Sequence, residues 1–486
     1  MTYMKEEKKL PPVVWAFVPL LILIVLLVCV ISAFGSDALS GASQIVLLVT
    51  AACCILIGFV LKTMHWDDFE RAVNENVSSV SQAILILLLI GAVGGSWMVS
   101  GIVPTMIYYG MQIINPHCFL VSSCLICAVV SVMTGSSWTT IATIGIALLG
   151  IGKAQGFGEG WIAGAIVSGA YFGDKISPMS ETTVLASSTT GTPLFTHIRY
   201  MLYTTIPAFV IGLVIFTVAG LLYTPETVQN IAAFSEGLGR VFVISPWLMA
   251  VPLVTAVMIA RRLPAVVILF CATLLACVAA TLVQTNLVDS IAGGDTGSWM
   301  NRFRGVMILV YGSTSLETGV SALNDLVATR GMAGMMSTVW LIFCVMIFGA
   351  SMSATGMIES IMRMFIHRAR TTFSLVGSTV GVGLFMNIVC ADQYLSLILT
   401  GNMFKEVYKR MGYESRLLSR TSEDAVTVTS VLIPWNSCGM TQSMVLGVPT
   451  LVYLPYCFFN YLSPVMTLLM AAIGYKIRRV VAMAHR

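Results

Sequence analysis

The stretch from Gly169 to Ser188, GAYFGDKISPMSETTVLASS, places an aspartate, a lysine and a glutamate among small hydroxyl residues, with apolar sequence on both sides. Ionisable side chains within membrane-length apolar sequence are energetically costly and often mark ion or proton paths. A hard cation such as sodium prefers oxygen ligands from carboxylates, hydroxyls and carbonyls. We therefore predict that Asp174, Glu181 and Thr182 bind a sodium ion.

Three further polar interruptions offer oxygen ligands of the same kind. They read MTGSSWTTIAT from residue 133, NIVCADQYLS from residue 387 and SRTSEDAVTVTSVLIPWNSCG from residue 419. The additional ligands predicted from them are Ser136, Ser137, Thr139, Asp392, Asp424, Thr427 and Asn436. A set of oxygen donors suits sodium and argues against a transition-metal site.

The acids in these interruptions also suit proton coupling. A carboxylate that is partly removed from water holds a proton more tightly, so protons and sodium can compete for the same oxygen atoms. The proton-coupling candidates are Asp174, Asp424 and Glu423. Lys175 carries the opposite charge, and it can hold the carboxylate of an anion or pair with an acid. The plainer interpretation, helix caps at the membrane surface, does not explain the threonine-rich sequence around these acids.

Both acidic stretches contain signals for a helix start. Ser177 followed by Pro178 predicts a helix that begins there, because serine is a favoured N-cap and proline fits the first helical position. Thr421 and Asp424 have the spacing of a capping box. These signals place the acids at interruptions between helical segments.

The composition is that of a membrane protein. Of the 486 residues, 57% are hydrophobic and 10% are charged, and the mean hydropathy is +0.90, whereas soluble proteins carry about 25% charged residues. The net charge of +4 gives no reason to expect a nucleic-acid partner. Most of the twelve cysteines lie in apolar runs, and no enzyme motif is present, so neither a disulfide framework nor an enzyme is expected.

The apolar sequence is long enough for many membrane crossings. The segments lie at about 13–34, 43–61, 79–101, 118–150, 160–172, 200–223, 241–260, 263–284, 334–353, 371–390 and 440–475. They predict roughly 11–14 crossings or half-crossings. The backbone should be helical, because the alternation of barrel strands is absent. The polar break at 387–396 lies between two basic clusters, so the chain should enter the membrane there and return.

The distribution of lysine and arginine predicts the orientation. The basic residues that we place in the cytoplasm include Lys5, Lys8, Lys9, Arg262, Arg368, Lys405, Lys476 and Arg486. We predict a cytoplasmic tail at 1–12, a first transmembrane repeat at 13–240, a second at 241–475 and a cytoplasmic tail at 476–486. The connector 35–42, which has no basic residue, should lie outside.

The two repeats show the same order of features, a hydroxyl- or amide-rich break followed by an acidic, threonine-rich break. Ser136 and Asp392 are 256 residues apart, and Asp174 and Asp424 are 250 apart. Paired interruptions in two halves are a sequence indicator of a transporter's binding site. We predict that acids and hydroxyls from both halves meet within the membrane around a cation.

GAYFGDKISPMSETT and RTSEDAVTVTSVLIPWNSCG closely resemble the two signature stretches of the NhaC family of sodium/proton antiporters, and NIVCADQYLSLILTGNMF and TGMIES also look like that family. The resemblance extends from about residue 13 to 475. It implies an all-α polytopic membrane protein of a prokaryotic inner membrane, with two inverted-topology repeats, re-entrant hairpins and broken transmembrane helices, usually as a homodimer. The residues that match the family's motifs are Asp174, Ser177, Glu181, Thr182, Asp392, Gln393, Glu423, Asp424, Thr427, Thr429, Pro434, Trp435 and Asn436.

The sequence departs from the family pattern near these residues. Glu181 stands where many relatives have aspartate, Val184 where asparagine is common, and Val426 where glycine is frequent. We predict a secondary antiporter that exchanges sodium for protons by alternating access, with the lipid bilayer, sodium and protons as partners and no cofactor. The alternative is a sodium- or proton-coupled exchanger of a small carboxylate metabolite, of the malate/lactate type. A channel fits less well, because paired broken helices favour alternating access.

Overall fold

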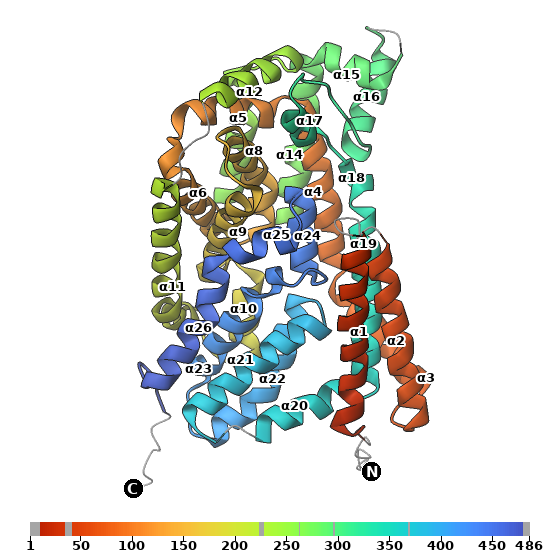
Figure 1. Ribbon diagram of the computed structural model, residues 1–486, viewed down its shortest axis with the longest axis vertical. Coiled ribbons are helices and arrows are strands. Elements are labelled where there is room, and N and C mark those ends of the chain that lie inside the picture. Colours follow the sequence, from red (N-terminus) through yellow and green to blue (C-terminus); the bar gives the residue numbers. More distant parts are fainter. Residues whose placement is uncertain are drawn as a thin grey trace.

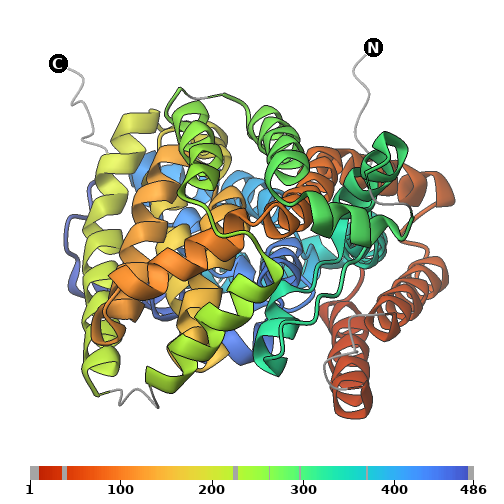
Figure 2. The ribbon, with the colours of Figure 1, turned by 90° about the horizontal axis from the view of Figure 1, so that it is seen from above.

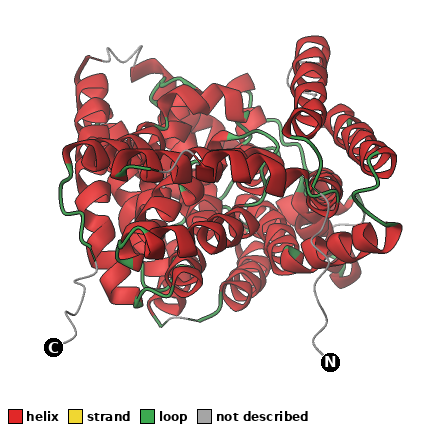
Figure 3. Ribbon diagram, turned by 90° about the horizontal axis from the view of Figure 1, so that it is seen from below, coloured by secondary structure: helices red, strands yellow, loops and turns green. Residues whose placement is uncertain are grey.

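The computed structural model describes residues 10–34, 41–222, 228–261, 263–294, 297–367 and 370–479. Within these ranges the chain forms helices joined by loops, without strands (Figure 3). Nine helices in the described ranges are long and apolar enough to cross a membrane, and the number rises to eleven if two bent helix pairs each count as one span. The predicted all-α polytopic class is confirmed. The connector residues 35–40 and the basic residues Lys5, Lys8, Lys9, Arg262, Arg368 and Arg486 lie outside the described residues.

The first helices form one flank of the molecule. They are α1 (Val13–Phe34), α2 (Ala42–Val60), α3 (Trp66–Ser79), α4 (Ser81–Val99) and α5 (Ile102–Ile113). α1 and α2 pack against each other, α2 packs on α19 (Met336–Ala354), and α1 packs on α20 (Met357–His367). Figure 2 shows α1 to α3 in red at one edge and α11 (Leu194–Leu222) in yellow-green at the opposite edge.

The first broken unit follows α5. Its elements are η2 (Pro116–Cys118), α6 (Phe119–Thr134), α7 (Ser137–Thr140), the π-helical turn η3 (Ile141–Gly145), α8 (Ile146–Ala154), α9 (Glu159–Ile176) and α10 (Glu181–Thr190). The chain reverses at Gly135, whose φ of 66° lies in the left-handed region. A Cβ at this position would lie 2.7 Å from the backbone carbon of Met179, so the tip of the hairpin requires glycine.

The second broken unit also consists of a hairpin followed by a broken helix, but its π-helical turn lies in a different place. Its elements are α21 (Thr372–Val389), α22 (Gln393–Arg410), α23 (Ser415–Ser422), the π-helical turn η5 (Glu423–Thr427), the 3₁₀ turn η6 (Ser430–Leu432) and α24 (Ser437–Leu446). The hairpin reverses at Ala391, where φ is 48°. Asp392 then caps α22 by accepting a hydrogen bond from the backbone N–H of Leu395 at 3.0 Å. The polar break at 387–396 is therefore the tip of a hairpin, as predicted.

The backbone landmarks of the two units recur at a constant spacing. Gly135 and Ala391, the two left-handed tips, are 256 residues apart (391 minus 135). The N-caps of α10 and α24, Ser180 and Asn436, are also 256 apart (436 minus 180). The left-handed C-cap glycines of the same helices, at 191 and 447, keep this spacing. The chain is thus built from two equivalent units, although their sequences show little identity.

The two units run in opposite directions. Figure 1 shows α6 and α8 in the upper half of the molecule, and α21 and α22 in the lower half. α9 lies above α10, whereas α23 lies below α24. The hairpin tips therefore enter from opposite ends and meet near mid-height, which is the inverted-topology arrangement that the resemblance implied.

The remaining helices connect and enclose the two units. Between them lie α12 (Val228–Val241), η4 (Pro246–Met249), α13 (Ala250–Ala260), α14 (Ala265–Val283), α15 (Thr285–Ala292), α16 (Trp299–Tyr311), α17 (Ser321–Val327) and α18 (Gly331–Gly334). The chain ends with α25 (Thr450–Tyr453), η7 (Leu454–Tyr456) and α26 (Phe458–Ile473). α26 packs on α11, so the helices that follow the two units also contact each other.

Two predicted helix starts are wrong. Ser177 ends α9, and α10 begins at Glu181 with Ser180 as its N-cap. The hydroxyl of Ser177 instead donates to the carbonyl of Val132 on α6 at 2.9 Å, a tertiary contact that the local signal does not reveal. Thr421 lies inside α23 and donates to the carbonyl of Leu417, so it forms no capping box.

Candidate ion-binding site

A cavity of about 420 Å³ lies where the tip of the first hairpin meets the first turns of α4, α10, α14 and α22. Its polar lining includes Ser136, Asp174, Glu181, Thr182, Gln393 and Tyr394. Of the described residues that line it, the charged ones are the two acids, Asp174 and Glu181. The field in the cavity therefore favours a cation.

Asp174 forms the acidic part of the cavity wall and is only 5% exposed. It lies two residues before the end of α9, facing the first hairpin. Its Oδ2 accepts two hydrogen bonds from Ser137, one from the backbone N–H at 3.1 Å and one from Oγ at 2.7 Å. These donors belong to the first residue of α7, so the helix N-terminus also stabilises a negative charge at Asp174.

The hydroxyls at the hairpin tip are partly used to hold the tip itself. Ser136 is the N-cap of α7, and its Oγ accepts from both the backbone N–H and the Oγ1 of Thr139, at 3.2 Å each. Ser136 lines the cavity, whereas Thr139 does not line it but holds the Ser136 hydroxyl in place through these hydrogen bonds.

Glu181 lies at the exposed side of the cavity and joins three helices. Its Oε1 accepts from Nε2 of Gln82 on α4 at 3.2 Å, and its Oε2 accepts from the hydroxyl of Tyr394 on α22 at 3.0 Å. Neither Gln82 nor Tyr394 was among the residues predicted from the sequence. Tyr394 lies two residues after Asp392 within the polar break, which was a usable signal. A glutamine at the start of an apolar segment, such as Gln82, indicates nothing by itself.

A second polar cluster lies on the other side of α9. Lys175 and Asp424, both fully buried, form an ion pair. Nζ of Lys175 donates to Oγ of Ser463 at 2.6 Å, Ser463 donates to Asp424 at 3.0 Å, and the hydroxyl of Thr467 donates to the second oxygen of Asp424. Lys175 was predicted either to hold the carboxylate of an anion or to pair with an acid, and in the structure it pairs with the acid Asp424.

Ser463 and Thr467 were also missed by the sequence analysis. Their spacing of four places them on one face of α26, within a mostly apolar segment, and this was the available signal. Since both oxygens of Asp424 accept hydrogen bonds from protein donors, its negative charge is balanced without a bound ion.

The remaining predicted ligands lie in the second unit, where two of them hold the breaks together. Asp392 accepts from Oγ of Ser437 at 3.0 Å in addition to capping α22. Asn436 donates to the carbonyl of Asn387 at 3.0 Å and accepts from the N–H of Cys438. Glu423 and Thr427 stand at the two ends of η5, and both are fully buried.

The structure thus divides the predicted ligand set. Those around the cavity are Ser136, Asp174, Glu181 and Thr182, with Ser137 and Thr139 one hydrogen bond away. Those in the second unit, away from the cavity wall, are Asp392, Asp424, Thr427 and Asn436, and the proton-coupling candidate Glu423 lies there too. The 256-residue spacing matches Asp174 with Ser430 rather than with Asp424, and Ser137 with Gln393. The Oγ of Ser430 is 3.3 Å from Oε1 of Gln393, so both units hold the hairpin tip to the neighbouring helix by an equivalent contact.

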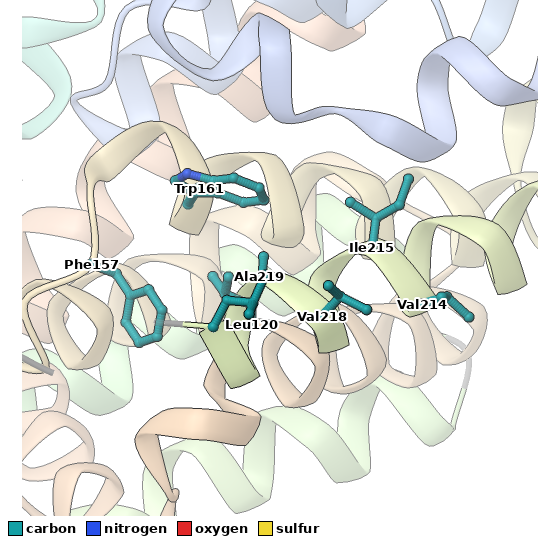
Figure 4. Close-up of a pocket in the computed structure, with 8 residues that line it drawn as sticks. Leu120, Phe157, Trp161, Val214, Ile215, Val218 and Ala219 are labelled. Carbon is teal, nitrogen blue, oxygen red and sulfur yellow. The ribbon is translucent and has the colours of Figure 1, made fainter. Parts of the chain in front are cut away.

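A larger cavity of about 530 Å³ lies against α11, away from these polar groups. Leu120, Phe157 and Trp161 face the side chains of Val214 and Val218 across it (Figure 4). All eight of its lining residues are apolar, so it offers an ion no ligand.

Comparison with known proteins places the chain among transporters. Residues 169–475 match the Na⁺/H⁺ antiporter family. The chain is 35% identical to the Na⁺/H⁺ antiporter NhaC of Alkalihalophilus pseudofirmus, over 89% of this chain and 91% of that protein. The chain belongs to the NhaC family of Na⁺/H⁺ antiporters. The NhaC antiporter of Bacillus subtilis is 31% identical, over 87% of this chain and 89% of that protein.

Membership of the NhaC family confirms the resemblance seen in the sequence. Another relative, the malate-2H⁺/Na⁺-lactate antiporter of Bacillus subtilis, is 34% identical over 86% of this chain and 87% of that protein. NhaC-type chains are thus related both to a protein named for sodium/proton exchange and to one named for organic-acid exchange. The two acidic signature stretches lie within the matched residues 169–475, and they supply the cavity wall and the buried ion pair.

Proposed function

We propose that this protein is a secondary antiporter that exchanges sodium ions for protons across the cytoplasmic membrane by alternating access. One observation carries the proposal: the charged residues that line the cavity at the hairpin tip are Asp174 and Glu181, both acidic. Such a cavity attracts cations. Family membership also supports sodium/proton exchange, because two NhaC relatives of this chain are named sodium/proton antiporters.

Asp174 is the proposed exchange site. Its carboxylate holds either a sodium ion or a proton, so one ion must leave before the other binds. Exchange results when the site opens alternately to the two sides of the membrane. Ser137 fixes the carboxylate through two donors on Oδ2. The hydroxyls of Ser136 and Thr182 are the neighbouring oxygen ligands in the cavity wall. Glu181 attracts cations at the exposed side, where Gln82 and Tyr394 hold it.

The carboxylate-metabolite alternative is less well supported by this cavity. Among its described lining residues there is no lysine or arginine to receive a carboxylate. Lys175, the basic residue next to Asp174 in the chain, is buried and paired with Asp424. Among the described lining residues, an organic anion would therefore face two acids without a counter-charge.

We also infer that the protein lies in the inner membrane of a prokaryote with both termini in the cytoplasm. Figure 1 shows that α1 begins and α26 ends at the same end of the molecule, which agrees with the basic residues at both ends of the sequence. The homodimer implied by the resemblance stays a prediction.

The test uses purified protein in sealed lipid vesicles that contain a pH-sensitive dye. An imposed sodium gradient should change the internal pH without any added metabolite. Asp174→Asn should abolish this change, while Glu236→Gln, on the exposed face of α12, should leave it intact. If the internal pH stays constant until malate or lactate is added, the carboxylate alternative replaces the proposal. Full exchange by Asp174→Asn would remove Asp174 from the exchange site.

A further inference from the structure

Glu423 is a fully buried carboxylate without a hydrogen-bond partner. Its side chain is 0% exposed, and neither Oε1 nor Oε2 has a hydrogen bond to any described residue. An uncompensated buried charge costs several kcal/mol, so native proteins pair such groups or use them to bind an ion or a proton. The buried acids Asp174, Asp392 and Asp424 all accept hydrogen bonds, which sets Glu423 apart.

The backbone at Glu423 is irregular in a way that its counterpart is not. Residues 423–427 form the π-helical turn η5, followed by the 3₁₀ turn η6, whereas the equivalent residues 167–171 lie in the regular helix α9. Such π-turns occur frequently at functional sites. Side-chain amides satisfy the carbonyls of this irregular segment, because Asn387 donates to Val426 and Asn460 donates to Val428, each at 2.7 Å.

Two threonine hydroxyls lie near the carboxylate, and the one on Thr182 already shares a hydrogen bond with Ser180 at 2.9 Å. Oγ1 of Thr427, at the other end of η5, is buried and has no hydrogen bond to a described residue. The hydroxyl of Thr182, on the first turn of α10, also faces Glu423, and α10 packs against η5. Thr182 lines the cavity as well, so it stands between the cavity and Glu423.

The neighbouring basic groups do not neutralise Glu423. Lys175 lies nearby, but its ammonium group bonds to Asp424 and Ser463. The guanidinium of Arg420, one helical turn before Glu423, lies over the ring of Tyr200 at 4.5 Å and makes no hydrogen bond to a described residue. No basic group among the described residues therefore pairs with Glu423, so a cation or a proton is the partner that its charge calls for.

We propose that Glu423, Thr427 and Thr182 form a second site for a sodium-sized monovalent cation, occluded behind the cavity wall and occupied together with the site at Asp174. The proposal rests on the proposed function, since it extends the same cation path by one step. A dehydrated cation would receive both carboxylate oxygens of Glu423 and the two threonine hydroxyls. Each chain would then hold two sodium ions, one on each carboxylate.

Equilibrium binding of radioactive sodium to the purified full-length chain in detergent tests the proposal. The wild type should bind two sodium ions per chain, and Glu423→Gln should bind one. Thr427→Val keeps the shape of the side chain and should weaken the second ion about tenfold while leaving the first unchanged. Asp289→Asn is the matched control, because Asp289 is also a buried carboxylate but pairs with Arg302 near the other end of the molecule. This variant should bind two ions.

The outcomes separate this proposal from the antiport proposal. One sodium ion bound by the wild type, or an equal number bound by the wild type and Glu423→Gln, would overturn the second site. Neither result affects the vesicle assay at Asp174. Failure of the antiport proposal would instead appear as a constant internal pH in wild-type vesicles under a sodium gradient, whatever number of ions binds. Each variant should give a monodisperse elution profile in gel filtration and an unchanged thermal transition. These controls show that the number of bound ions is measured on folded protein.

Discussion

The buried pair of Lys175 and Asp424 should hold α9, η5 and α26 together, and its removal offers the clearest quantitative test of the fold around the site. Both side chains are fully buried, and the ammonium and carboxylate share hydrogen bonds with Ser463. If Asp424→Asn removes the negative charge, the ammonium group stays buried with neutral partners only. If Lys175→Met removes the positive charge, the carboxylate stays buried with two hydroxyl donors.

The expected magnitudes follow from this geometry. Loss of one partner of a buried pair costs about 3–5 kcal/mol, because the other charge is left uncompensated. Replacement of both by apolar residues of similar volume removes both desolvation penalties, so Lys175→Met combined with Asp424→Leu should cost less than either single change. The leftover hydroxyls of Ser463 and Thr467 add about 1–3 kcal/mol at most.

The assay is reversible unfolding of the purified variants in mixed detergent, with the free energy of unfolding compared across the double-mutant cycle. The exposed pair Arg240 and Glu236 on α12 provides the matched control. An exposed pair contributes about 0–1 kcal/mol, so removal of either control partner should be barely measurable. The reasoning is refuted if the buried single variants lose no more stability than the control variants, or if the double variant loses the sum of the two single losses.

Three further predictions concern the cavity and its packing. Ser137→Ala removes the hydroxyl donor to Asp174, a hydrogen bond to a charged group worth about 1.5–3 kcal/mol, so the sodium KM of exchange in vesicles should rise about 10–100-fold; an unchanged KM would contradict the role of this contact. Gly169→Ala would place a Cβ 2.0 Å from the carbonyl oxygen of Cys124, so we expect a loss of about 1–3 kcal/mol or more in the unfolding assay, whereas Gly94→Ala, with open space around its Cβ, should be neutral or slightly stabilising. If protons and sodium compete for one carboxylate, the sodium KM should rise as the pH falls; a KM that is independent of pH would argue for separate sites.

The polar breaks could be located in the sequence because they are local features. The Gly135–Ser136 and Ala391–Asp392 tips interrupt apolar runs that are otherwise of membrane length, and the amides of a lipid-embedded chain leave few alternatives to helices. The acids of the cavity, Asp174 and Glu181, could be identified for the same reason, since ionisable groups stand out in such sequence. The helix starts next to them could not be fixed, because Ser177 satisfies its hydroxyl through α6 rather than through its own helix.

The equivalence of the two halves needed the structure. Sequence features alone pair Asp174 with Asp424, at a spacing of 250, because both are acids in threonine-rich stretches. The backbone instead repeats every 256 residues, which matches Asp174 with Ser430. Backbone geometry is set by caps and left-handed turns, and these can be kept by different residue types, as Ser136 and Asp392 show at the two hairpin tips.

By itself the sequence determined that the chain is a helical membrane protein with broken segments and oxygen-rich gaps, because the length of apolar runs and the cost of buried charge act locally along the chain. Only the tertiary structure decided which charges are free. Lys175 neutralises Asp424 across 249 residues, whereas Asp174 faces a cavity and Glu423 has no hydrogen-bond partner among the described residues. The adjacent residues Asp174 and Lys175 point in different directions from α9. The packing of distant helices therefore places Lys175 in an ion pair and Asp174 at the cavity.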